Sequence, residues 1–235
     1  MKYILFDLDC TLYFLDEKNF LPVYFDAIGK KAISIGYDYK VATRAMYEGS
    51  VNMGNSDGEK TNEQLFWEAF EKVTGPLPKE DRAKFDSYYD SDFDKLKYMS
   101  KRVAGINEVI KSLKEKGYIL IVATNPVLPM VAQLTRMNWA GLDPKDFALI
   151  TCYEEFHYSK PDPRFYLEVA NRFNAKPEDC LMVGNDVMGD ILAAKEAGLE
   201  VFLIKNFVFN RNNDDISDIP QGDYNDLLKY IDSLQ

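Results

Sequence analysis

The stretch Asp7-Leu-Asp9-Cys-Thr11-Leu follows directly on the short apolar run Tyr3-Ile-Leu-Phe6. The apolar run is typical of a buried strand, and ligands of open α/β sheets bind outside the carboxyl ends of their strands. Two carboxylates this close together are unfavourable at such a point unless a cation or a proton joins them. The stretch therefore predicts a Mg²⁺ site in which one carboxylate is free to attack phosphorus. The alternative is a solvated turn, which Asp and Thr also favour.

Three further polar clusters follow apolar runs in the same manner. They are Thr124-Asn125-Pro126, Ser159-Lys160-Pro161 and Gly184-Asn185-Asp186 with Asp190. In residue type and order the four clusters resemble the motifs of the haloacid dehalogenase-like superfamily of phosphohydrolases. Those motifs are D-x-D-x-T, a Thr or Ser after the second strand, a Lys, and an acidic G-D-x-x-x-D-like element. The resemblance spans the chain from residue 1 to about residue 205.

The resemblance implies a role for each motif residue. Asp7 is expected to be the nucleophile that forms an aspartyl-phosphate intermediate. Asp9 is expected to protonate the leaving alcohol and then to activate water. Thr124 and Asn125 are expected to bind the phosphoryl oxygens, and Lys160 to offset the charge of Asp7 and of the transition state.

The same resemblance draws the Mg²⁺ ligands from the first and fourth motifs: the Asp7 carboxylate, the Asp9 backbone carbonyl and the first acid of the fourth motif. The fourth motif has two alignments, with Asp186 as that acid or with Asn185 in its place. Asp186 is preferred because a carboxylate offsets the Mg²⁺ charge better than an amide does. Asp190 is then expected to hold Lys160 by a charge-assisted hydrogen bond. Supporting positions are expected at Thr11, Asn185 and Asp190.

Hydrophobic patterning divides the chain. Continuous apolar runs alternate with amphipathic helices in residues 98–235, which predicts a parallel sheet with helices on both faces. Residues 14–97 carry helical faces only, so we expect a doubly wound α/β core (1–13 and 98–235, Rossmann-like) with a smaller all-helical cap domain (14–97). In the resembled family, a helical insertion at this point closes over the catalytic face. Glu48–Lys60 is predicted to be a flexible connector between helices.

Composition and net charge argue against some classes of binding partner. The 235 residues include 46% hydrophobic and 28% charged residues, as in ordinary globular proteins, and the net charge of −10 argues against nucleic acid and anionic membranes. No signal peptide or membrane span is expected, because the chain leads straight into a strand and its apolar runs stay below about 18 residues. Three scattered cysteines fit reduced thiols in the cytoplasm. The sequence leaves the oligomeric state open.

The predicted activity is that of a Mg²⁺-dependent phosphatase acting on a small phosphorylated metabolite. A dehalogenase is disfavoured, because that branch of the superfamily lacks an acid at the position of Asp9. A phosphomutase uses the same core and stays an alternative, although the connector 48–60 looks too mobile to seal a site against water. From another class, a phosphorylation-regulated receiver module also uses Asp, Thr, Lys and Mg²⁺. Its acids are arranged differently, and its length is roughly half.

Overall fold

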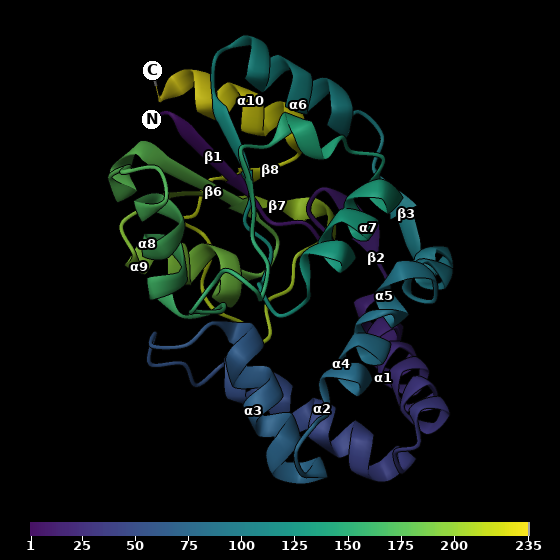
Figure 1. Cartoon of the computed structure of the whole chain (residues 1–235). Coiled ribbons are helices and arrows are strands. Elements are labelled where there is room, and N and C mark those ends of the chain that lie inside the picture. Colours follow the sequence, from purple (N-terminus) through teal and green to yellow (C-terminus); the bar gives the residue numbers. More distant parts are fainter. Residues whose placement is uncertain (235) are drawn as a thin grey trace.

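The computed structural model describes residues 1–234 and places a six-stranded sheet at the centre of the molecule (Figure 1). The strand order is β5-β4-β1-β6-β7-β8, and all neighbouring strands are parallel. Their bounds are β1 Tyr3–Phe6, β4 Ile119–Val122, β5 Leu149–Ile150, β6 Cys180–Gly184, β7 Glu200–Ile204 and β8 Gln221–Gly222. The predicted parallel α/β sheet is thereby confirmed. Asp7 leaves the sheet from the central strand β1, at the point where the strand order reverses and ligands of such sheets bind.

Helices cover both faces of the sheet. Residues alternate between the faces along each strand, so Ile4 and Phe6 of β1 join one apolar core, while Tyr3 and Leu5 join the other. The first core is closed by α6 Ile106–Glu115, α7 Met130–Ala140 and α10 Tyr224–Ser233; the second is closed by α8 Pro163–Asn171 and α9 Ala193–Glu196. This doubly wound arrangement is the one that the sequence pattern predicts.

The buried face of α7 differs from the expected one. Leu128, Val131 and Leu134 mark this helix in the sequence, yet Val131 and Leu134 are each 38% exposed. The buried residues of α7 are Ala132, Gln133, Arg136, Met137, Trp139 and Ala140. Two of these are polar, which hides the buried face from an argument based on apolar spacing.

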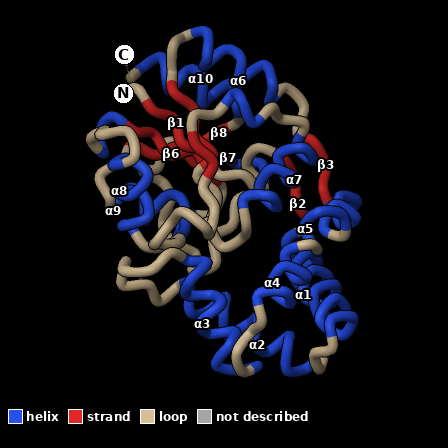
Figure 2. Tube along the Cα trace, viewed as in Figure 1, coloured by secondary structure: helices blue, strands red, loops and turns tan. Residues whose placement is uncertain are grey.

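Residues 17–99, here called the helical region, contain helices without strands (Figure 2). Their bounds are α1 Glu17–Ile35, α2 Tyr39–Met53, α3 Asn62–Thr74, α4 Lys79–Asp86, α5 Tyr88–Ser91 and a 3₁₀ segment Phe93–Met99. The chain enters and leaves this region through two short antiparallel strands, β2 Tyr13–Leu15 and β3 Ser100–Arg102. In Figure 1 the helical region lies below the carboxyl ends of the sheet strands.

Two local expectations for the helical region are wrong. The predicted connector 48–60 is helical up to Met53, because α2 continues through Gly49, and only residues 54–61 link it to α3. The helical spacing of Phe85, Tyr89, Phe93 and Leu96 predicts one helix, but this stretch forms α4, α5 and the 3₁₀ segment. Within residues 1–234, no helix is long and apolar enough to cross a membrane.

Candidate active site

Lys160 joins the first and fourth motifs at the carboxyl edge of the sheet. Its Nζ donates to Asp7 Oδ1 at 2.8 Å and to Asp190 Oδ1 at 2.6 Å. All three side chains are largely buried, with 12% of the Asp7 side chain exposed and less of the other two. Charge-assisted hydrogen bonds of this kind are among the strongest in proteins. The structure thus brings together three residues that lie up to 183 positions apart in the chain.

Backbone groups fix the second oxygen of Asp190. Oδ2 accepts the N–H groups of Asn185 and Asp186, both at 3.0 Å. Gly184 lies against the same carboxylate, and a Cβ at that position would overlap with it. Asp190 is therefore held on one side by the loop after β6 and on the other by Lys160.

Asp9 is held by residues that the motifs do not contain. Its Oδ2 accepts a hydrogen bond from the buried Arg136 guanidinium, and its Oδ1 accepts from the Tyr13 hydroxyl at 2.5 Å. Arg136 also donates to Gln133 in the preceding turn of α7 and to Thr124 Oγ1 at 3.3 Å. The buried Arg136 guanidinium therefore holds the Asp9 carboxylate in one orientation. Removal of either partner would leave an uncompensated charge.

The second motif connects β4 to the Lys160 loop. Thr124 is buried beside Arg136, and its carbonyl accepts from the Thr151 hydroxyl at 2.5 Å. Asn125 Oδ1 accepts the backbone N–H of Lys160 at 3.1 Å. Asn125 therefore positions the loop that carries Lys160, and its binding of phosphate oxygens stays a prediction.

Asp186 and Asn185 point to different partners. Asp186 Oδ1 accepts the backbone N–H groups of Met188 and Gly189 at 3.0 and 3.1 Å, which begins a π-helical turn, Val187–Leu192. Its Oδ2 pairs with Arg211 at 2.8 Å. The amide of Asn185 is used elsewhere: Oδ1 accepts from Thr11 at 3.0 Å, and Nδ2 donates to the Phe207 carbonyl at 2.9 Å.

The site carries unbalanced negative charge. Burial raises the pKa of the Asp7 carboxyl well above its ordinary value, and nearby Asp190 raises it further, although Lys160 acts in the opposite direction. Burial alone would lower the pKa of Lys160, yet Asp190 and Asp7 together raise it well above its ordinary value. Lys160 therefore stays a cation. A further cation beside Asp7 would stabilise the charged form of its carboxyl group, which burial and Asp190 disfavour.

A large cavity opens in front of these residues. Its volume is about 890 Å³, and Asp7, Asp9, Thr124, Lys160 and Asp186 line one end. The other end is lined by side chains of the helical region. The cavity therefore lies between the carboxyl edge of the sheet and the helices.

Several residues of the site are not predicted by the four motifs. Tyr13 and Arg136 hold Asp9, Gln133 supports Arg136, and Arg211 pairs with Asp186. Apolar spacing gives no signal for Gln133 and Arg136, because these two polar residues belong to the buried face of α7. A buried Arg usually has an anionic partner, and the acidic first motif is where one would seek it.

Comparison with known proteins assigns the chain to a family. Residues 1–198 match the family model of haloacid dehalogenase-like hydrolases. The chain belongs to this family. The resemblance seen in the four motifs is confirmed, and with it an enzyme of the hydrolase type.

Relatives cover most of the chain. A glyceraldehyde 3-phosphate phosphatase of Methanopyrus kandleri is 26% identical over 240 residues, covering 100% of this chain and 98% of the relative. A ribulose-1,5-bisphosphate 5-phosphatase of Halopiger xanaduensis is 28% identical over 208 residues, covering 85% and 83%. The crystal structure of a 2-haloacid dehalogenase from Pseudomonas syringae aligns over 100% of both chains with a TM-score of 0.66 and 19% identity. This last likeness shows the shared fold alone.

Proposed function

We propose that this hydrolase is a Mg²⁺-dependent phosphatase that removes the phosphoryl group of a small phosphorylated metabolite through an aspartyl-phosphate intermediate. The observation that carries the proposal is the Lys160 ammonium bridging Asp7 and Asp190 at the end of the central strand, with the acid Asp9 two residues away. The phosphatase names of the two relatives support the reaction type.

Asp7 supplies the nucleophilic oxygen. One of its oxygens is hydrogen-bonded to Lys160, so the side chain is oriented before a substrate arrives. Attack on phosphorus forms an aspartyl-phosphate and releases the alcohol, and water then cleaves the acyl phosphate to regenerate Asp7. One difficult hydrolysis thereby becomes two displacements. The Lys160 cation offsets the charge on the equatorial phosphoryl oxygens.

Asp9 supplies the proton transfers in this proposal. It gives a proton to the leaving alcohol in the first displacement and takes one from water in the second. Arg136 and Tyr13 each contact one of its oxygens, so they fix the orientation of the carboxyl group.

The donor set fits Mg²⁺. Mg²⁺ binds hard oxygen ligands and keeps several waters, and the Asp7 carboxylate, the Asp9 carbonyl and the Asp186 carboxylate are of this kind. Burial and acidic neighbours raise the pKa of Asp7, so they disfavour its charged form. A cation bound beside Asp7 would stabilise that charge. No three acidic, His or Cys side chains of residues 1–234 form a ready cluster, so the proposed set relies on a backbone carbonyl and water. When bound, Mg²⁺ would offset charge on the nucleophile and the phosphoryl group.

The amide of Asn185 already bridges Thr11 and Phe207, and this supports Asp186 as the ligand from the fourth motif. Arg211, which pairs with Asp186, is the group that a cation there would compete with. We further propose that residues 14–97 act as a cap domain over the core formed by 1–13 and 98–235. We also propose a cytoplasmic location, because the three cysteine thiols are buried and unpaired.

The proposal is tested by phosphate release from a panel of phosphate monoesters, with and without Mg²⁺. Asp7→Asn is the matched variant, because it removes the nucleophilic charge and changes the shape of the side chain little. Turnover should fall by at least about 1,000-fold, as it does when a covalent nucleophile is lost. Near-normal turnover by a folded Asp7→Asn protein would contradict the mechanism. Accumulation of an isomeric phosphate without free phosphate would identify a mutase.

A further inference from the structure

The cavity in front of Asp7 is much deeper than a phosphoryl group requires. Its volume of about 890 Å³ lies near the upper end of the range of about 300–1,000 Å³ for sites that hold drug-sized ligands. From the sheet edge it extends between α1 and α3, as far as Ile28 and Met46 in the helical region.

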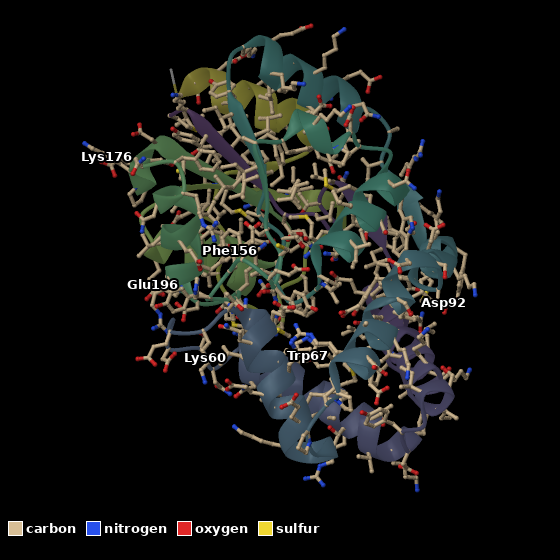
Figure 3. The ribbon with its side chains drawn as sticks, in the orientation of Figure 1. Lys60, Trp67, Asp92, Phe156, Lys176 and Glu196 are labelled. Atoms are coloured by element: carbon tan, nitrogen blue, oxygen red, sulfur yellow. The ribbon has the colours of Figure 1, made fainter. Side chains whose placement is uncertain are left out.

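Aromatic rings line both walls of the deep part. Phe20 and Tyr24 of α1 and Tyr89 of α5 form one wall, and Phe66 and Trp67 of α3 form the other. In Figure 3 the Trp67 side chain extends from α3 toward the space between α3 and α4. Rings on opposite walls suit a flat ligand, because aromatic groups pack well in offset-stacked and edge-to-face arrangements.

Polar groups on these walls are few. The Tyr24 and Tyr89 hydroxyls bond to each other, and the buried Trp67 indole N–H interacts with the Tyr153 side chain. Buried indole N–H groups usually have an acceptor, and water occupies a cavity stably only where two or more polar groups hold it. The walls are therefore suited to an apolar ring and are poorly suited to a hydrated sugar chain.

Charge argues against a second phosphate or a carboxylate in the deep part. Three cations that line the cavity, Arg136, Lys160 and Arg211, are each paired with an aspartate of the site. The helical wall adds the acids Glu17 and Asp86 with the single cation Lys18. A bisphosphate or a phosphorylated acid would have to place its second anion on this wall.

We infer that the substrate is a phosphate monoester whose alcohol carries a planar aromatic ring system, bound between α1 and α3 while its phosphoryl group lies at Asp7. The inference rests on the proposed phosphatase function and names the substrate class of that same site. The reaction is ordinary hydrolysis: the phosphorus–oxygen bond to the alcohol breaks, and water supplies the hydroxyl group of the phosphate and the proton of the alcohol.

The test compares 3-phenylpropyl phosphate with propyl phosphate on the unmodified enzyme with Mg²⁺. The two leaving alcohols are nearly equal in acidity, so the ratio of kcat/KM values reports binding of the ring. The ratio should be at least about 30-fold in favour of the phenyl compound, since burial of a ring and its aromatic contacts both contribute. A nucleoside 5′-monophosphate compared with ribose 5-phosphate should show the same preference.

Two variants locate the preference. Trp67→Leu should reduce the phenyl-to-propyl ratio by about tenfold, because it removes the largest ring of the α3 wall. Tyr47→Leu is the control: Tyr47 belongs to α2 but is 61% exposed, and the ratio should stay unchanged. Loss of circular dichroism in Trp67→Leu would be seen separately, and the comparison on the unmodified enzyme does not depend on that variant.

The outcomes separate the two proposals. If both members of each pair release phosphate with kcat/KM values within about threefold, the aromatic site is wrong and the phosphatase stands. If ribose 5-phosphate or propyl phosphate is preferred, the aromatic site is also wrong. If no phosphate is released from any of the four compounds, the phosphatase proposal fails, and the substrate inference fails with it.

Discussion

The carboxyl edge of the sheet and the helical region face one cavity with opposite chemistry. At the sheet edge, Asp7, Lys160 and Asp190 form a buried chain of charged hydrogen bonds that backbone N–H groups complete. The helical wall is made largely of rings, such as those of Tyr24 and Trp67. Under the proposed function, the sheet edge binds the phosphoryl group and the helices select the alcohol.

The two regions are also built differently. The residues of the sheet edge stand at the ends of parallel strands, and their positions are fixed by the register of β1 with β4 and β6. The rings of the helical wall come from four helices, α1, α3, α4 and α5, and their separation depends on how α1 and α3 pack. We therefore expect substitutions at the sheet edge to change the rate for every substrate, and substitutions on the helical wall to change the ranking of substrates.

After Asp7→Asn, the largest effect is expected for Lys160→Met. Two unit charges about 4 Å apart interact by about 4 kcal/mol at an effective dielectric constant of 20, which corresponds to about 1,000-fold in rate. Turnover should fall by about that factor for all substrates, while their ranking persists. Lys176→Met is the control, because Lys176 is exposed and points away from the site (Figure 3). A loss below tenfold would mean that the sheet edge does not depend on Lys160.

Sequence reasoning succeeded where position along the chain determines position in space. Asp7, Thr124, Lys160 and Asp186 all follow strands of one parallel sheet, so their gathering at one edge follows from the strand pattern. Trp67 shows where such reasoning stops. Its helical spacing predicts a core residue, and it is indeed only 7% exposed, but it lines the cavity, which depends on the distance between helices.

Arg136 was missed for a related reason. Its partner Asp9 lies 127 positions away, and the apolar residues Val131 and Leu134 suggest the wrong buried face for α7. The extent of α2 was misjudged because Gly49, Ser50 and Asn52 are typical of loops. In the structure α2 and α3 pack together, so that Gly49 lies against the Phe66 ring with no room for a Cβ. Tertiary packing overrides local propensity at this point.

Magnesium should stabilise the protein through the sheet edge alone. At about 100 times its Kd, a ligand adds about 2.7 kcal/mol to stability, or roughly 5–10 °C in Tm for a chain of this size. Asp7→Asn and Asp186→Asn should lose most of this shift, measured by calorimetry with and without EDTA. Asn185→Ala should keep it; a greater loss in that variant would assign the fourth-motif ligand to Asn185.

A smaller effect is expected for Arg136→Gln. Without the guanidinium, Asp9 keeps only the Tyr13 contact, and a misplacement of about 1 Å can reduce a rate by about 100-fold. We expect kcat to fall by about 10- to 100-fold with little change in KM, and Arg136→Lys to recover part of the loss. An unchanged kcat, or a change confined to KM, would show that Arg136 does not position Asp9.

The smallest effect concerns the junction between the two regions. Thr61 begins α3 with a capping box to Gln64, and the next residue, Asn62, donates to the carbonyls of Phe156 and Pro126 in the core. Thr61→Ala should destabilise the protein by about 0.5–2 kcal/mol in urea unfolding and change kcat/KM by less than about threefold. Thr43→Ala, at a half-buried position within α2, is the matched control. A large loss of activity in Thr61→Ala would show that the regions do not act separately.

The central claim is that Asp7 carries the phosphoryl group during turnover. The most direct measurement is acid quenching of the Mg²⁺-bound enzyme during turnover, followed by mass spectrometry of its peptides. The account predicts one added phosphoryl group on the peptide that contains Asp7, with the modification absent from Asp7→Asn. Steady phosphate release with no modified peptide, or with the phosphoryl group on any other residue, would contradict it.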